Sequence, residues 1–406
     1  MQYLEFKKVK IPFIFEENRD FPIIVLKLVF KNCGRSFDEI AGLARMFAKL
    51  LNEGVNDKFF KDLEFRAINL GASSGFESLE INLSLLKEHK NYAAKALAAL
   101  LKNPRFEEKI LHRLKLSSLG ELASKNSDFD YLAKNLLNAT IFKYKEFSSP
   151  NDGDEKSIDS ISLNSLKNFH KKHIHLNNLI ITLGGDLSFD EGKDFVKKIL
   201  EGLEKGQTLA NKNYNLNSKN EDKILVRKES EQAYIYFASP FFAEFKDEDL
   251  YLGKIALFIL GQGGFGSRIM EEVRVKRGLA YSAYAMLDMS LSYKRVFGYL
   301  QTKNENAKEA KKLVKEIFKD FVQKGVSQSE LNAAKNFLIG STPLRYESLS
   351  KRLALGFNEY YQGLELGHYK KELEKIKKAD LKKLNAYIKN HKELLNLSFA
   401  SIQNEG

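Results

Sequence analysis

Two stretches of the chain share one pattern at a fixed separation. Residues 163–185 read LNSLKNFHKKHIHLNNLIITLGG, and residues 381–402 read LKKLNAYIKNHKELLNLSFASI. The aligned pairs, all at an offset of 218 (384 minus 166), are Leu166 with Leu384, Phe169 with Tyr387, His173 with His391 and Asn178 with Asn396. Each copy places apolar residues at helical spacing before an apolar run, which predicts an amphipathic helix that leads into a strand. The chain therefore contains an internal repeat about half its length.

The segments in front of these copies repeat in the same order. Residues 103–122 and 324–344 each combine a turn, an acidic helix start and a helix, and Lys115 and Lys335 within them are 220 residues apart (335 minus 115). A long helical pattern precedes each segment, and a strand-like pattern precedes that helix. A period this long indicates a duplicated domain rather than a solenoid.

The repeat predicts an α+β fold of two tandem homologous domains. Runs of hairpin-like strands and long helices favour, in each domain, a mainly antiparallel sheet with helices on one face. Residues 204–223 are polar, rich in Asn and Lys, and poor in apolar residues, which is typical of a linker. We therefore expect an N-terminal domain at 1–203, a linker at 204–223 and a C-terminal domain at 224–406.

The composition fits a soluble globular protein. The chain has 406 residues, of which 43% are apolar and 29% charged, a length that suits two domains of roughly 200 residues each. No apolar run approaches the roughly 18 residues of a membrane span, so we expect no integral membrane segment. The first residues lack a basic cap followed by an apolar run. We expect a cytoplasmic protein, or a periplasmic one if a leader has been removed.

Charge and cysteine content exclude further classes. The net charge is +12, but the 65 Lys and Arg residues are spread along the whole chain among 53 Asp and Glu residues. We therefore expect a lysine-rich solvated surface and no nucleic-acid partner. The single cysteine, Cys33, cannot form an intrachain disulfide, and its apolar surroundings predict an inert core thiol.

A glycine-rich stretch, GQGGFGSRIMEEVRVKRGLAY at 261–281, resembles a phosphate-binding loop at first sight. However, such a loop follows a strand, whereas residues 245–260 before it have acidic residues at the start and apolar residues at helical spacing. We expect Gly261, Gly263 and Gly264 to end that helix with positive φ angles. Ser267 then has the place of the N-cap of the next helix. This context excludes a nucleotide-binding loop.

Arg274 and Tyr281 stand seven residues apart in the same stretch. We expect one on a helix and the other on the strand after a turn at Gly278, so the two side chains could converge on one carbonyl group. A cation and a phenol together can bind a peptide or stabilise an oxyanion. The spacing alone favours the plainer alternative of a solvated arginine beside a half-buried tyrosine.

The whole chain resembles the pitrilysin/insulinase family of zinc peptidases, in its mitochondrial-processing-peptidase-like bacterial branch. Three stretches carry the resemblance: ILGQGGFGSRIMEEVRVKRGLAYSAYA (259–285), residues 9–55 with the first strands and the helix after them, and LKNFHKKHIHLNNLIITLGGDL (166–187). It implies that the two tandem domains form one half of a metallopeptidase whose two halves enclose the substrate like a clamshell. It also implies that Arg274 and Tyr281 contact the substrate main chain and assist the tetrahedral intermediate. The four glycines implied in substrate binding are Gly261, Gly263, Gly264 and Gly266.

The family's zinc motif, His-x-x-Glu-His on a helix, is replaced in this chain. The matching stretch is GLARMFAKLL. Arg45 stands at the first histidine of the motif, Ala48 at the glutamate and Lys49 at the second histidine. Arginine cannot deprotonate to bind a metal, and a lysine ammonium repels Zn²⁺. The resemblance places the third ligand at Glu121. We therefore expect no metal in this chain, and we hypothesise that Glu121 pairs with Arg45 or Lys49.

Other catalytic centres have little support in the sequence. Only His170, His173 and His175 cluster among the seven histidines, and we expect them to be polar loop residues rather than a metal site. Cys33 has no recognisable catalytic partner, and no G-x-S-x-G motif is present.

These observations predict a non-catalytic, substrate-binding subunit of a heteromeric zinc metallopeptidase. The expected partners are a homologous subunit that carries the zinc, or a second copy of this chain, and an unfolded peptide substrate. The family resemblance implies that the peptide adds as a strand to the edge at GASSGFESLEI (71–81). Two alternatives remain: a structural scaffold with no proteolytic role, and a stand-alone peptidase with atypical metal ligands.

Overall fold

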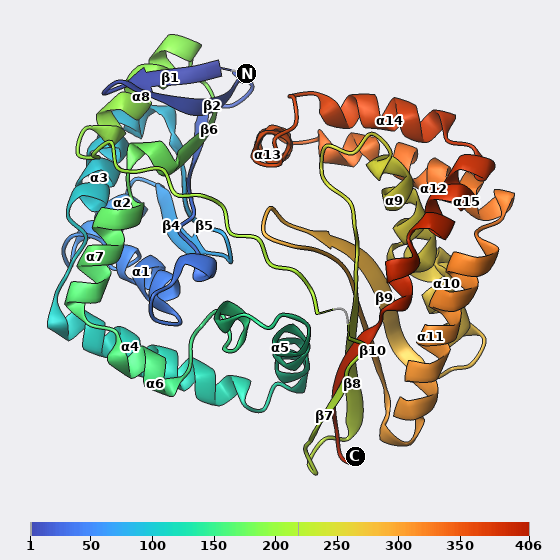
Figure 1. Cartoon of the computed structure of the whole chain (residues 1–406). Coiled ribbons are helices and arrows are strands. Elements are labelled where there is room, and N and C mark those ends of the chain that lie inside the picture. The colour runs from blue at the N-terminus through green and yellow to red at the C-terminus, as the bar shows by residue number, and fades with distance from the viewer. Residues whose placement is uncertain (1, 218, 406) are drawn as a thin grey trace. The chain divides into compact units, whose positions relative to one another are not determined.

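A computed structural model describes residues 2–217 and 219–405, which form two compact units (Figure 1). Unit 1 comprises residues 1–123, 149–212 and 345–360. Unit 2 comprises residues 124–148, 213–344 and 361–406. The prediction of two units is confirmed, but the units are not contiguous as the ranges 1–203 and 224–406 implied. Two segments, 124–148 and 345–360, belong to the unit built mainly from the other half of the sequence.

Unit 1 contains a six-stranded sheet in the order β1-β2-β6-β3-β5-β4. The strands are β1 (Gln2–Phe6), β2 (Val9–Glu17), β3 (Ile23–Lys31), β4 (Asn69–Ser74), β5 (Ser78–Leu86) and β6 (Leu179–Gly185). Only β2 and β6 pair in parallel, and every other pair is antiparallel. Strand β4 lies at one edge of this sheet.

Unit 2 repeats this arrangement with five strands in the order β7-β11-β8-β10-β9. The strands are β7 (Asp222–Val226), β8 (Gln232–Pro240), β9 (Ala280–Met289), β10 (Lys294–Lys303) and β11 (Ser398–Gln403). Again one pair, β7 with β11, is parallel and the others are antiparallel. The order therefore matches β2-β6-β3-β5-β4 strand for strand, as a duplicated α+β domain requires.

Helices cover one face of each sheet and form the core with it. In unit 1 they are α1 (Leu43–Leu51), α2 (Phe59–Glu64), α3 (Lys90–Lys102), α4 (Glu108–Lys125), α6 (Glu155–Ser160), α7 (Leu163–His173) and α8 (Phe189–Leu200). In unit 2 they are α9 (Leu250–Leu257), α10 (Arg268–Met270), α11 (Ala307–Lys324), α12 (Gln328–Gly340), α14 (His368–Lys378) and α15 (Leu381–Asn390). Strand β3 shows the pattern: Ile24, Leu26 and Leu28 are buried in the core, whereas Val25 and Lys27 on the opposite face are partly exposed.

The two exchanged segments carry equivalent helices. Helix α5 (Phe129–Ile141) and helix α13 (Leu349–Tyr361) have 13 residues each and begin 220 residues apart (349 minus 129). In unit 2, α5 packs on β8 and β11. In unit 1, Leu349 and Leu353 of α13 lie so close to Gly184 in β6 that any side chain there would collide with them. The repeat thus extends to the helices, and each half of the sequence supplies one helix to the other unit.

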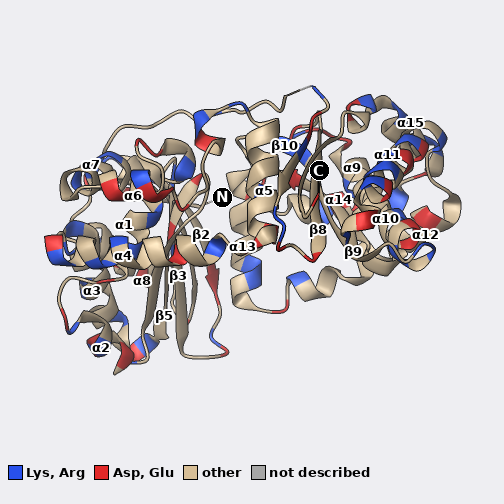
Figure 2. Ribbon diagram, turned by 90° about the horizontal axis from the view of Figure 1, so that it is seen from below, with Lys and Arg blue, Asp and Glu red and all other residues tan. Residues whose placement is uncertain are grey.

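No described helix is both long and apolar enough to cross a membrane, in line with the expectation from the sequence. Lysine and arginine residues are distributed over both units and alternate with acidic residues (Figure 2). The surface therefore carries mixed charge, as the dispersed sequence positions predicted.

Candidate functional site

Helix α1 contains the residues that align with the family's zinc motif. Arg45 and Lys49 are four residues apart and so lie on one face of the helix. Ala48 is buried against the core. Asp38 stabilises the start of α1, because its carboxylate accepts hydrogen bonds from the backbone N–H groups of Gly42 and Ala44 at 3.0 and 2.8 Å. Burial raises the pKa of Asp38 to about 7.

The hypothesis that Glu121 pairs with a cation of α1 is confirmed for Lys49. The Lys49 Nζ lies 2.8 Å from Glu121 Oε1 and 2.8 Å from Ser118 Oγ, and both partners are on α4. Arg45 pairs instead with Asp152, at 3.4 Å between Nε and Oδ1. An ammonium group thus pairs with Glu121, the residue to which the family resemblance assigns the role of third zinc ligand.

These residues do not fit a zinc ion. Zinc sites use thiolate, neutral imidazole and carboxylate ligands, and of the four aligned residues only Glu121 supplies such a ligand. Arg45 and Lys49 bring two cations where two neutral ligands would be needed. Within residues 2–217 and 219–405, no group of three or more His, Cys, Asp and Glu side chains is arranged to hold a metal. The prediction of a degenerate zinc site therefore rests on the chemistry of its side chains.

The Lys49–Glu121 pair is half-exposed, so we expect it to contribute little to stability. Lys49→Met should lower the free energy of unfolding by no more than about 1 kcal/mol, because exposed ion pairs contribute little. Urea unfolding measures this change, with Lys58→Met, an exposed lysine in the loop after α1, as the control. A loss of several kcal/mol would show that the pair is an essential part of the fold.

The glycine-rich stretch forms a loop between two short helical segments, as predicted, but its glycines have a different role. Of the three glycines expected to have positive φ, Gly264 has a φ of 60°, while Gly263 has a φ of −76°. Gly261 lies inside a π-helical turn, Phe258–Gln262, that extends α9. A Cβ atom at Gly261 would come within 2.3 Å of the Ala285 backbone nitrogen. Close approach to β9, and not helix termination, therefore requires this glycine.

Ser267 takes the N-cap position of α10, although its side chain makes no cap hydrogen bond. Its hydroxyl instead donates to the Gly264 carbonyl at 2.7 Å. This bond closes the loop, which includes the fourth implied glycine, Gly266. Phe265, between the last two glycines, is 66% exposed. The loop thus presents an aromatic side chain to solvent.

Arg274 and Tyr281 do converge. Arg274 lies in a π-helical turn, Glu271–Val275, that continues α10, and Tyr281 lies at the start of β9. The guanidinium carbon of Arg274 is 4.7 Å from the centre of the Tyr281 ring and 4.8 Å from that of Phe265. Both rings are largely exposed. We call Phe265, Arg274 and Tyr281 the arginine–aromatic cluster.

Arg274 forms no ion pair with any carboxylate in the described part of the chain. The acidic residue nearby, Glu272, pairs with Lys276 and Arg277 instead. The two rings support the Arg274 side chain by cation–π contact. Its five N–H donors can therefore bind an acceptor from another molecule, since no carboxylate among the described residues pairs with them. The sequence analysis assigned no role to Phe265. Its only signal in the sequence was an aromatic residue amid glycines.

The segment expected to form the substrate edge, 71–81, is only partly at an edge. Residues 71–74 belong to β4 at the end of the sheet, whereas 78–81 lie in β5, which is paired on both sides. A hairpin turn within the segment explains the difference. The edge prediction is therefore correct for β4 and wrong for β5.

The three clustered histidines are not polar loop residues. His173 and His175 are 1% and 2% exposed, and His173 packs against Phe169 at 4.6 Å between ring centres. His170 Nε2 lies 2.7 Å from the Leu101 carbonyl oxygen. Burial lowers the pKa of His173 to about 4 and also lowers the pKa values of His170 and His175. The prediction of solvated side chains was wrong because His170 and His173 lie on α7 against aromatic side chains of the core, and His175 lies in the buried connection from α7 to β6.

Acid should therefore destabilise unit 1. Below the unfolded value of about 6.5, the unfolded chain binds a proton at His173 while the folded protein binds none until about pH 4. We expect the free energy of unfolding to fall by about 3 kcal/mol over this range on account of His173. Urea unfolding between pH 7 and pH 4 measures the slope. His173→Leu should reduce it, and substitution of the exposed His112 should not. An unchanged slope in His173→Leu would contradict the assignment.

Comparison with known proteins agrees with the fold and with the family that the sequence resembles. Residues 160–338 match the family model described as "Peptidase M16 inactive domain". The chain is 39% identical over 410 residues to a Helicobacter pylori protein, "Non-peptidase homolog YmxG", and the match covers all of this chain and 94% of that protein. The chain therefore belongs to the peptidase M16 family. Within that family it is a non-catalytic member that lacks the His-x-x-Glu-His motif.

Two solved structures resemble the chain. The crystal structure of a peptidase M16 inactive domain from Pseudomonas fluorescens has a TM-score of 0.88 at 26% identity, and the match covers 98% of this chain and 96% of that one. The periplasmic protease PqqL from Escherichia coli has a TM-score of 0.78 at 12% identity, and the match covers 95% of this chain but 43% of PqqL. The second likeness shows a shared fold.

Proposed function

We propose that the chain is the non-catalytic, substrate-binding subunit of a heteromeric zinc metallopeptidase. In this proposal the subunit supplies Arg274 and Tyr281 to a homologous partner that carries the zinc ion and the glutamate base. The observation that carries the proposal is the arginine–aromatic cluster. An arginine held between two exposed rings, without a carboxylate partner among the described residues, is suited to bind a group from another molecule.

The chemistry of the cluster suits peptide hydrolysis. When water attacks a peptide carbonyl, negative charge develops on the carbonyl oxygen, and donors placed at that oxygen stabilise the transition state. The guanidinium N–H groups of Arg274 and the hydroxyl of Tyr281 are such donors. Neither group is placed to activate the attacking water, because each is used as a hydrogen-bond donor to the carbonyl oxygen. The proposed chemistry therefore needs a second subunit.

The size of a relative supports pairing with a homologue. PqqL is more than twice as long as the part of it that this chain matches. One PqqL polypeptide therefore has room for two segments, each the size of this whole chain. The first half of PqqL, solved by itself, also matches this chain, with a TM-score of 0.77. For this chain, a separate homologue of similar size could therefore take the place of the second segment. A second copy of this chain would lack the zinc ligands.

A reconstitution assay tests the proposal. The purified chain and a zinc-bearing homologue from the same cell are assayed with an unstructured peptide, each alone and then mixed. We expect the chain alone to be inactive and the mixture to be more active than the homologue alone. A stable complex with no gain in activity would support the scaffold alternative. Chelator-sensitive cleavage by the chain alone would support the stand-alone alternative.

A further inference from the structure

The free edge of β4 is occupied by a side chain of the same unit. The backbone N–H of Ala72 donates to Asn52 Oδ1 at 2.7 Å, and Asn52 Nδ2 donates to the Ala72 carbonyl oxygen at 2.9 Å. Alternate residues of an edge strand direct both backbone groups away from the sheet, and Ala72 is such a residue. The carboxamide of Asn52 thus makes the pair of bonds that an added strand would make. We call this contact the Asn52 edge cap.

The position of Asn52 is fixed by helix α1. It is the C-cap residue of that helix, and its backbone N–H reaches the carbonyl oxygens of Ala48 and Lys49 at 3.3 and 3.1 Å. The side chain of Asn52 is nevertheless exposed to solvent. It can therefore rotate away from Ala72 without disturbing the core.

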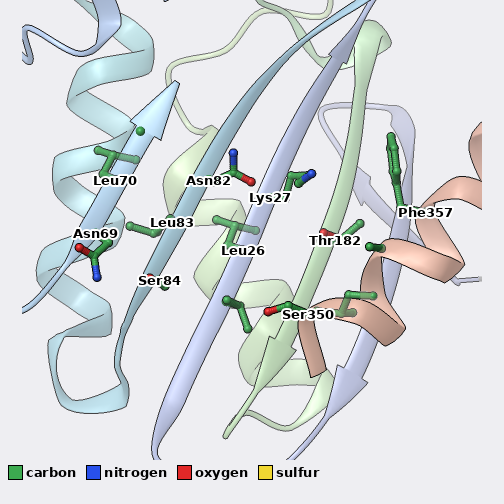
Figure 3. A pocket seen from close by; sticks show the side chains of 14 residues that line it. Leu26, Lys27, Asn69, Leu70, Asn82, Leu83, Ser84, Thr182, Ser350 and Phe357 are labelled. Carbon is green, nitrogen blue, oxygen red and sulfur yellow. The ribbon is translucent and has the colours of Figure 1, made fainter. Parts of the chain in front are cut away.

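A cavity of about 520 Å³ lies beside this edge, on the sheet face opposite to the core (Figure 3). Strands β4, β5, β3 and β6 form one side of it and helix α13 the other. The side chains that line it include Asn69, Asn82, Ser84, Thr182, Leu353 and Phe357. Gly71 of β4 also lines it, and a Cβ atom there would meet nothing within 4 Å. The cavity is therefore open next to Ala72.

The cavity carries no net charge among its lining side chains and their direct partners. Lys27 is the charged residue in the lining, and its Nζ lies 2.8 Å from Glu80 Oε2. The remaining lining groups are amides, hydroxyls and apolar carbons. A charged side chain that entered would lose hydration without gaining a counter-ion, which is unfavourable. An uncharged side chain would lose much less.

We propose that the Ala72 edge and the adjacent cavity form a peptide subsite for an extended polypeptide with an uncharged side chain, and that Asn52 closes this subsite in the free protein. This inference rests on the peptide-binding part of the proposed function. The peptide main chain replaces the two bonds of the Asn52 edge cap. Its side chain that points to the α13 face of the sheet enters the cavity above Gly71.

Removal of the Asn52 edge cap tests whether Asn52 closes the subsite in the free protein. The probes are fluorescein-labelled unstructured peptides that differ at one position, with leucine, glutamate or lysine. Asn52→Ala should bind the leucine peptide about tenfold more tightly than the wild type, because two competing hydrogen bonds are gone. The glutamate and lysine peptides should bind both proteins more weakly than the leucine peptide does, because the cavity offers their charges no counter-ion. Asn56→Ala, in the loop after α1, is the matched control. Equal affinity of Asn52→Ala and wild type would overturn the proposal.

Filling the cavity tests whether a side chain of the peptide enters it above Gly71. Gly71→Val places a side chain in open space at a backbone conformation that valine can adopt. In the Asn52→Ala background it should abolish the gain for the leucine peptide, and an undiminished gain would overturn the cavity assignment. Hydrogen exchange of the Ala72 amide gives a second measurement. The exchange should be faster in Asn52→Ala and slow again when the leucine peptide binds. Failure to slow would overturn the subsite, whereas the role of Arg274 is judged separately in the mixed assay.

Discussion

Arg274→Ala should lower kcat of the assembled peptidase by about 10²–10³-fold, with little change in the amount of complex formed. This is the loss that follows removal of one donor from a transition-state oxyanion in other hydrolases. Arg274 has no carboxylate partner within the described residues, and Phe265 and Tyr281 hold its side chain. Its removal therefore leaves no unpaired acidic group behind, and the fold of unit 2 should persist.

The neighbouring Arg277 provides the matched control. It has the same charge, lies three residues away and pairs with Glu272. Arg277→Ala should leave kcat close to the wild-type value. Tyr281→Phe keeps the ring against Arg274 but removes the hydroxyl, so it separates the support of the arginine from the donated hydrogen bond. Full activity of both Arg274→Ala and Tyr281→Phe would contradict the proposed role of the cluster.

Restoration of the zinc motif should produce a metal site. The triple variant Arg45→His, Ala48→Glu, Lys49→His places two imidazoles on one face of α1, next to Glu121 on α4. We expect it to bind roughly one zinc ion per chain, with Glu121 as the third protein ligand. The Lys49–Glu121 ion pair, at 2.8 Å, shows that position 49 faces this carboxylate. Elemental analysis after dialysis measures the zinc content.

Two controls show whether the zinc is at the restored motif. Glu121→Gln in the triple-variant background should weaken zinc binding, because an amide oxygen is a poorer ligand than a carboxylate. Substitution of His112, which is exposed on α4 away from the motif, should not. A triple variant that folds but binds no zinc would show that the surroundings of α1, and not only the three side chains, have lost the metal site.

Local sequence patterns were sufficient to predict much of the fold. The offsets of 218 and 220 residues predicted a duplicated α+β domain, and the matching strand orders confirm it. The replacement of zinc ligands by Arg45 and Lys49 was also evident, because it depends on the identity of side chains at helical spacing. The same reasoning about charge predicted that Glu121 pairs with Arg45 or Lys49, and the structure shows that the partner is Lys49.

Features that depend on long-range packing were not predictable. Nothing in the composition of α5 or α13 indicates that the helix packs in the unit built mainly from the other half of the sequence. The burial of His173 depends on where the connection between α7 and β6 runs, and a histidine-rich segment resembles a solvated loop in sequence. Asn52 and Ala72 are 20 residues apart, so their contact is determined by the tertiary structure. The same holds for Phe265 beside Arg274.

The zinc content of the purified wild-type chain decides whether this chain can be a catalytic subunit by itself. The chain is dialysed against zinc, freed of excess metal, and measured by elemental analysis together with its peptidase activity in the absence of any partner. We expect far less than one zinc per chain and no activity. One tightly held zinc per chain that Glu121→Gln removes, together with chelator-sensitive cleavage, would contradict this expectation.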